Sequence, residues 1–149
     1  MFFAFADQLE RLPPGKRGVR TARELRKLAV RHQRLLLKSK DFDPVIHRSK
    51  KDLQSMAKAG TYADSPELLA LEKELKVNVR LLISSNGEQR WCWLQPNPED
   101  RNSDWPTIRL GFRFVSDNSA HNHYYSMRAF SKTYDFVVTP VENSRIFKL

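Results

Sequence analysis

The hydrophobic period of this chain changes near residue 76, and that change constrains the fold more than any other feature. Before it, leucines at positions 68, 71 and 75 recur at the spacing of one helix face. After it, apolar residues alternate with others along Val77, Val79, Leu81 and Ile83. Alternation of this kind is typical of a strand with one buried face. The sequence therefore predicts helices before this point and strands after it.

Start and stop signals divide the first part of the chain into several helices. Residues 3–12 are expected to form a helix that ends before the breaker Pro-Pro-Gly at 13–15. The Asp-Pro pair predicts a short helix over 43–46, and another is expected over 50–57. The clearest signal is Asp64-Ser65-Pro66-Glu67, which has the pattern of a capping box with proline in the first turn.

An amphipathic helix is predicted from about residue 21 to residue 38. Its apolar face is expected to contain Ala22, Leu25, Leu28, Ala29, Leu35 and Leu36. Its other face is expected to carry Arg20, Arg23, Arg26, Lys27, Arg31, Arg34 and Lys38. The leucine stripe indicates that one face of this helix is buried.

The second part of the chain is predicted to form strands and turns. A hairpin turn at 85–88 joins a strand over 77–83 to one over 90–94, and a polar loop fills 95–106. The best alternation in the chain is Ile108, Leu110, Phe112 and Phe114. A turn at 116–119 leads to a segment at 121–128, and a last strand is expected at 134–138. Helices first and strands later predict an α+β fold in which helices pack on a small mixed β-sheet.

Composition narrows the class of protein. The 149 residues, 40% of them apolar, fit one domain with its own core. The single cysteine, Cys92, excludes an intrachain disulfide. No apolar run reaches the roughly 18 residues that a membrane span needs. The short Phe-rich start lacks the basic residues of a signal peptide. We therefore expect an intracellular protein, cytoplasmic or nuclear, without contact to a membrane.

The net charge of +9 lies entirely in the first part of the chain. Residues 1–60 contain 15 basic and 6 acidic side chains, whereas residues 61–149 contain 11 of each. Such asymmetry is typical of a surface that meets a negatively charged partner, or of a solvated helix face.

Three separated stretches of the sequence share the motifs of one enzyme family. The first is 2–9, Phe-Phe-Ala-Phe-Ala-Asp-Gln-Leu. The second is 56–64, Met-Ala-Lys-Ala-Gly-Thr-Tyr-Ala-Asp, with the helix and strand that follow it. The third is 108–114 followed by His123-Tyr124-Tyr125-Ser126-Met127-Arg128. Together, over about residues 2–128, they resemble the OTU (ovarian tumour) family of cysteine deubiquitinases.

The resemblance implies an OTU-like cysteine-protease fold over residues 1–128, with 129–149 as a C-terminal tail. The family hydrolyses the isopeptide bond between ubiquitin and a lysine, so ubiquitin or a ubiquitin conjugate is the implied partner, and no cofactor is implied. Such catalysis needs a thiolate at a helix N-terminus, an imidazole base and an oxygen that orients the imidazole. His123 matches the base, and Tyr125 stands where the family has an orienting Asn or Asp.

The nucleophile of the family has no counterpart in this sequence. Met1 falls one position after the expected cysteine, which belongs to an Asp-Gly-x-Cys element. We therefore expect the chain as given to be inactive as a peptidase. An internal Met taken as the start, a truncated product and a true pseudoenzyme would all account for this, and the upstream reading frame distinguishes them.

Other interpretations compete for the same residues. Cys92 lies between Trp91 and Trp93 within a strand, which indicates a structural thiol. His121 and His123 lack the further ligands of a zinc site. The strand aromatics are expected in the core. Two alternative functions remain open: a non-catalytic ubiquitin-binding module, and a nucleic-acid-binding domain that uses the basic helix. The oligomeric state is not predicted.

Overall fold

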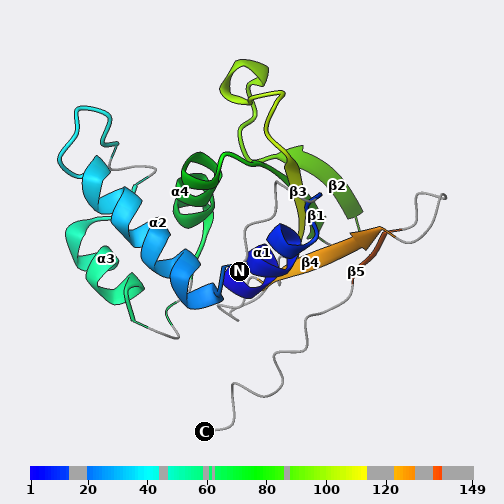
Figure 1. Ribbon diagram of the computed structural model, residues 1–149, viewed down its shortest axis with the longest axis horizontal. Helices are drawn as coiled ribbons and strands as arrows, with labels where there is room; N and C mark the ends of the chain where they lie inside the picture. The colour runs from blue at the N-terminus through cyan, green and yellow to red at the C-terminus, as the bar shows by residue number, and fades with distance from the viewer. Residues whose placement is uncertain are drawn as a thin grey trace, which may run out of the picture.

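A computed structural model describes residues 1–13, 20–43, 47–58, 61, 63–85, 88–113, 123–129 and 136–138. Helices come first: α1 (Phe2–Glu10), α2 (Ala22–Leu36), α3 (Lys50–Met56) and α4 (Ser65–Leu75). Strands follow: β1 (Asn78–Ser85), β2 (Glu88–Trp93), β3 (Thr107–Arg113), β4 (His123–Ala129) and β5 (Phe136–Val138), with a 3₁₀ turn at Pro98–Asp100. The predicted order of helices and strands is confirmed (Figure 1).

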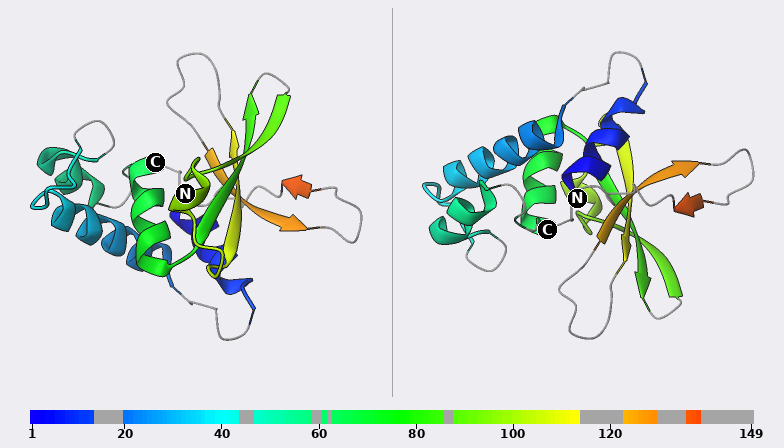
Figure 2. Two further views of the ribbon diagram at one scale, coloured as in Figure 1. Left: turned by 90° about the horizontal axis from the view of Figure 1, so that it is seen from above. Right: turned by 90° about the horizontal axis from the view of Figure 1, so that it is seen from below.

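The strands form one sheet in the order β2-β1-β3-β4-β5. The central pair, β1 and β3, is parallel, and the other pairs are antiparallel. Figure 2 shows the helices gathered on one side of β1, β2 and β3. The fold is therefore α+β, with helices packed on a small mixed sheet, as the sequence predicts.

The core lies between this sheet and the helices. On β1, Val79 and Leu81 are buried, and on β3 their parallel partners Ile108 and Leu110 are buried beside them. The helices contribute Phe5, Leu9, Leu25, Ala29, Leu68 and Leu71 to the same cluster. Burial of this apolar area is the main force that holds the two layers together.

Helix α1 buries one face against β3 and β4. Its buried residues are Phe2, Ala4, Phe5, Gln8 and Leu9. Phe3, the next residue of the same helix, is 49% exposed. Successive side chains of an α-helix point about 100° apart around its axis, so the residues next to a buried Phe2 cannot all face inward.

Helix α2 begins with a capping box that the sequence analysis did not identify. The Thr21 hydroxyl accepts the Glu24 N–H at 3.2 Å, and the Glu24 carboxylate accepts the Thr21 N–H at 2.8 Å. The helix buries Leu25, Ala29, Val30 and Gln33.

Two predictions for α2 are wrong. Leu35 was expected on the buried face but is 62% exposed, and Arg26 was expected on the exposed face but points inward. Because the core side of α2 is set by α1, α3 and α4 together, Val30 and Gln33 are buried in place of the last leucines.

Helix α4 starts and ends as its sequence indicates. The Glu67 carboxylate accepts the Asp64 backbone N–H at 2.7 Å, which is the glutamate half of the predicted capping box. The helix ends at Lys76, whose φ of 52° is left-handed, and the Val77 N–H then bonds the Glu72 carbonyl at 3.2 Å. The chain passes from this cap directly into β1.

The predicted hairpin of β1 and β2 is confirmed, since the two strands pair antiparallel and Ser85 pairs with Glu88. Strand β5 falls within the tail strand expected over 134–138. Several predictions fall outside the described residues: the short helix over 44–46, the turn residues 86 and 87, Phe114, the turn at 116–119 and His121. Among the helices that the structure describes, none is long and apolar enough to cross a membrane.

Candidate functional site: the α1–β4 junction

Gln8 joins α1 to the strands β3 and β4. Its side-chain amide donates to the Ser126 hydroxyl at 2.8 Å and to the Met127 carbonyl at 2.7 Å. Its carbonyl oxygen accepts the Arg109 backbone N–H at 3.1 Å. Since Gln8 is only 7% exposed, these bonds form in a largely dry interior, where they fix the position of the helix on the sheet.

Asp7 adds a second connection at the same place. Its carboxylate accepts a hydrogen bond from the Ser126 hydroxyl and a bidentate pair from Arg11, with N···O distances of 2.7 and 2.8 Å. The middle of β4 is thus held by two consecutive residues of α1. We call this region, together with the beginnings of both elements, the α1–β4 junction.

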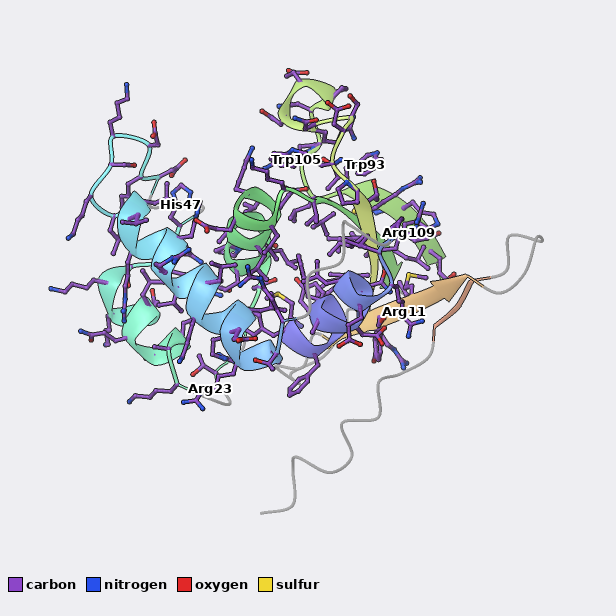
Figure 3. All side chains as sticks on the ribbon, in the orientation of Figure 1. Arg11, Arg23, His47, Trp93, Trp105 and Arg109 are labelled. Carbon is purple, nitrogen blue, oxygen red and sulfur yellow. The ribbon has the colours of Figure 1, made fainter. Side chains whose placement is uncertain are left out.

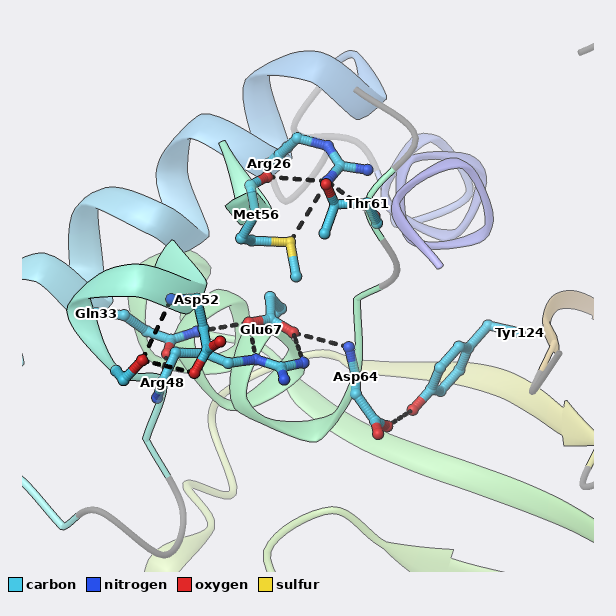
Figure 4. A network of polar contacts seen from close by, with 10 residues as sticks. Arg26, Gln33, Arg48, Asp52, Met56, Thr61, Asp64, Glu67 and Tyr124 are labelled. Atoms are coloured by element: carbon cyan, nitrogen blue, oxygen red, sulfur yellow. Dashed lines mark hydrogen bonds and ion pairs between the residues drawn. The ribbon is translucent and has the colours of Figure 1, made fainter. Parts of the chain in front are cut away.

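The beginning of α1 is held by Arg26 of α2. The guanidinium of Arg26 lies over the Phe2 ring, 4.8 Å from its centroid. It also donates to the carbonyls of Met56 and Thr61, both at 3.0 Å (Figure 4). Arg26 therefore brings the start of α1, the end of α3 and the segment before α4 to one point.

The beginning of β4 is tied to that same segment. The Tyr124 hydroxyl donates to the Asp64 carboxylate at 2.9 Å, a contact that Figure 4 shows at the edge of the polar network. The Tyr124 ring packs on Phe112, with 4.8 Å between the ring centroids. In Figures 1 and 2 the beginning of β4 lies beside the N-terminal end of α1.

The two site residues expected from the sequence lie in this strand. His123 is the first residue of β4, and its backbone pairs with Arg113. Its side chain lies outside what the structure describes. Tyr125 is half-buried and pairs with Gly111. Since Tyr124 and Ser126 contact the helical layer, alternation along the strand places Tyr125 on the opposite face.

The residues that make the junction were within the stretches that suggested the family, but none was singled out as a site residue. They are Asp7, Gln8, Asp64, Tyr124 and Ser126. The only signal was the polar pair Asp-Gln at the end of an apolar helix run, because a buried amide or carboxylate requires a partner. The sequence gives no indication of which strand supplies that partner.

The electrostatics at the start of α1 are dominated by burial and by Arg26. Burial, and then the nearby Arg26 charge, lower the pKa of the Met1 amino group from 8.0 to about 6. Burial disfavours a charge of either sign at this point, whereas the Arg26 cation and the helix dipole act against a positive charge and in favour of a negative one.

The lowered pKa of the Met1 amine predicts a pH-dependent stability for a polypeptide that starts at Met1. Between about pH 6 and 8 the unfolded chain binds a proton that the folded chain rejects. The free energy of unfolding should therefore rise with pH over this window, by roughly 1 to 3 kcal/mol, and stay level above it. Urea denaturation at several pH values measures this.

Acetylation of the Met1 amine is the matched control, because it removes this titration and leaves every histidine unchanged. The acetylated chain should lose that part of the pH dependence. Equal pH profiles for the free and acetylated chains would contradict the buried position of this amine.

A second polar cluster lies outside the junction, between α2, α3 and α4. The Glu67 carboxylate, fully buried, accepts from Arg48 at 3.1 Å twice and from the Gln33 amide at 3.0 Å (Figure 4). The hydrogen bond to Glu67 raises the pKa of Arg48. The cluster fixes the start of α4 and hence the segment that holds both Arg26 and Tyr124.

Cys92 has the environment of a structural thiol. It lies half-buried on β2 opposite Leu81, and burial raises the pKa of its thiol. A nucleophile needs the opposite shift. The flanking Trp91 and Trp93, expected in the core, are instead half-buried and stack with Arg80 at 5.0 and 5.3 Å.

No group of histidine, cysteine and acidic side chains that could hold a metal ion occurs among the residues that the structure describes. In comparisons with known proteins, the chain matches no protein-family model and no curated protein. The sequence motifs and the geometry of the α1–β4 junction are therefore the features from which a function is inferred.

Proposed function

We propose that this chain is an OTU-like domain related to ubiquitin-specific cysteine proteases, which holds ubiquitin or a ubiquitin conjugate at the α1–β4 junction. One observation carries the proposal: the beginning of α1 lies beside the beginning of β4, where His123 stands. A thiol protease needs this arrangement, because its nucleophile at a helix N-terminus must meet an imidazole from another element.

The chemistry of the junction supports the proposal. A thiol one position before Met1 would lie at the N-terminus of α1, near the Arg26 guanidinium. The helix dipole and this cation would both stabilise a thiolate. The proposal requires the His123 imidazole, at the first position of β4, to turn toward the α1 N-terminus and not to the face that carries Tyr125. There it would take the thiol proton as general base and return it to the leaving amine.

The third member of the machinery differs from the family pattern. Tyr125 stands at the position of the orienting Asn or Asp. A phenol oxygen accepts a hydrogen bond from an imidazole N–H, but more weakly than a carboxylate does. The proposal therefore gives Tyr125 at most a weak orienting role.

The polypeptide Met1–Leu149 is expected to bind ubiquitin without cleaving its conjugates. Its one thiol, Cys92, lies on β2 and has a raised pKa, so it provides no nucleophile. Titration of isotope-labelled ubiquitin should shift the NMR signals of the flexible ubiquitin C-terminus. Ubiquitin dimers should remain intact over the same period.

A matched pair of variants locates the binding surface. His123→Trp places a bulky ring at the junction and should abolish the shifts. Lys51→Trp adds the same ring at an exposed position of α3 and should leave them unchanged. Absence of binding at millimolar ubiquitin, or binding that is indifferent to His123→Trp, would refute the proposal.

A further inference from the structure

A row of cations runs along the solvent side of α2. It consists of Arg23, Lys27, Arg31 and Arg34, with Lys38 just beyond the helix end, and all five are exposed. We call it the α2 stripe. Its members are three or four residues apart, so they share one side of the helix, opposite the buried Leu25 and Ala29. Figure 3 shows Arg23 pointing away from the rest of the molecule.

The charges of the stripe are largely uncompensated. In the part of the chain that the structure describes, only Arg31 has an acidic partner, Glu74 at 3.1 Å, and that arginine side chain is 66% exposed. No ion pair joins Arg23, Lys27 or Arg34 to an acidic residue of the described part. Glu24, the nearest acid on the helix, is bonded to Thr21.

The structure also separates the stripe from Arg26, a cation of α2 that serves the fold. Arg26 is adjacent in sequence, yet it points inward and bonds the Met56 and Thr61 carbonyls. The other cations of α2 therefore have no comparable structural role. Like charges one helical turn apart repel each other, so a row of them weakens the helix unless a partner neutralises it.

Neighbouring elements extend the positive surface. Lys50 and Lys51 begin α3, which packs beside α2, and both are exposed. The whole net charge of +9 belongs to residues 1–60, the part of the sequence that contains α2 and α3. A partner that approaches this side of the molecule therefore meets a predominantly positive field.

We propose that the α2 stripe binds the phosphate backbone of a nucleic acid without reading its base sequence. The row from Arg23 to Arg34 is straight and about 16 Å long, so it can follow a regular array of phosphates. Three of its five members are arginines, whose guanidinium groups pair with phosphate through two hydrogen bonds. The stripe contains none of the amide side chains that usually read adenine edges in the major groove, and a comparison of two unrelated duplexes tests whether its arginines read guanine.

The test uses a short fluorescent DNA duplex and fluorescence anisotropy at several salt concentrations. The variant R23E/K27E/R34E reverses three charges of the stripe. If each original residue neutralises one phosphate, binding should weaken sharply. The slope of log affinity against log salt should become less negative by about three. Two duplexes of unrelated sequence should bind the unaltered protein equally.

A control variant, R90E/R109E/R113E, changes the net charge equally but on exposed strand positions. It should retain most of the affinity and the original slope. Equal losses in the two triple variants would overturn the proposal, as would competition by poly-glutamate as strong as by unlabelled duplex. Thermal denaturation of both variants shows that they are folded, so a loss of binding is not a loss of structure.

Discussion

Replacing Glu67 by alanine should lower the free energy of unfolding by about 3 to 5 kcal/mol, which is a large part of the stability of an ordinary domain. The Glu67 carboxylate is fully buried and accepts from Arg48, from Gln33 and from the Asp64 backbone. Its removal leaves the Arg48 charge without its counterion, and a partly buried unpaired charge is strongly unfavourable.

Urea denaturation of the variant and the unaltered protein measures this loss. Glu24→Ala is the matched control, because Glu24 forms the equivalent capping contact at the start of α2 but is exposed. It should lose about 1 kcal/mol or less. A third variant, Glu67→Gln, keeps the shape of the side chain and should lie between the two. Equal effects for Glu67→Ala and Glu24→Ala would show that burial of the Glu67 cluster is not what stabilises the fold.

Local signals were sufficient to predict the helices α1 to α4 and most of the strands, whereas β4 was expected only as a segment after a turn. The Asp-Ser-Pro-Glu motif fixed the start of α4, and the alternation after residue 76 predicted β1. The turn motif at 85–88 predicted the hairpin of β1 and β2. Each of these features depends on residues close together in the sequence, where capping, turn geometry and side-chain periodicity act directly.

Contacts between distant residues could not be predicted in the same way. Nothing near Arg26 indicates that this cation points inward while Arg23 and Lys27 face solvent. The choice depends on carbonyls at 56 and 61, which are about 30 residues away in sequence. The parallel pairing of β1 with β3 also follows from the packing of whole elements.

The candidate site shows the same difference between local motifs and contacts of distant residues. The sequence suggested His123 and Tyr125 as candidates through a short motif, but the residues that hold the α1–β4 junction emerged only from the structure. Gln8 contacts Ser126 across 118 positions of sequence, and Asp64 contacts Tyr124 across 60. Such pairs form because the core brings α1 and β4 together. No periodic pattern in a single sequence indicates them.

The largest functional effect is expected from adding the missing nucleophile. A polypeptide extended by Asp-Gly-Asn-Cys ahead of Met1, with Cys92→Ala to remove the other thiol, would carry a cysteine at the N-terminus of α1. The helix dipole and Arg26 should lower the pKa of that thiol. His123 should act as its base, so the loss of His123 should slow the reaction by about 10² to 10⁴-fold.

Covalent labelling of this extended protein by a ubiquitin whose C-terminus carries an electrophile tests the account most directly. A single adduct at the added cysteine should form rapidly. His123→Ala should strongly slow its formation, and the polypeptide Met1–Leu149 should form no adduct. Labelling at the same slow rate with and without His123, or no adduct at all, would contradict the claim that α1 and β4 form the two walls of a thiol-protease cleft.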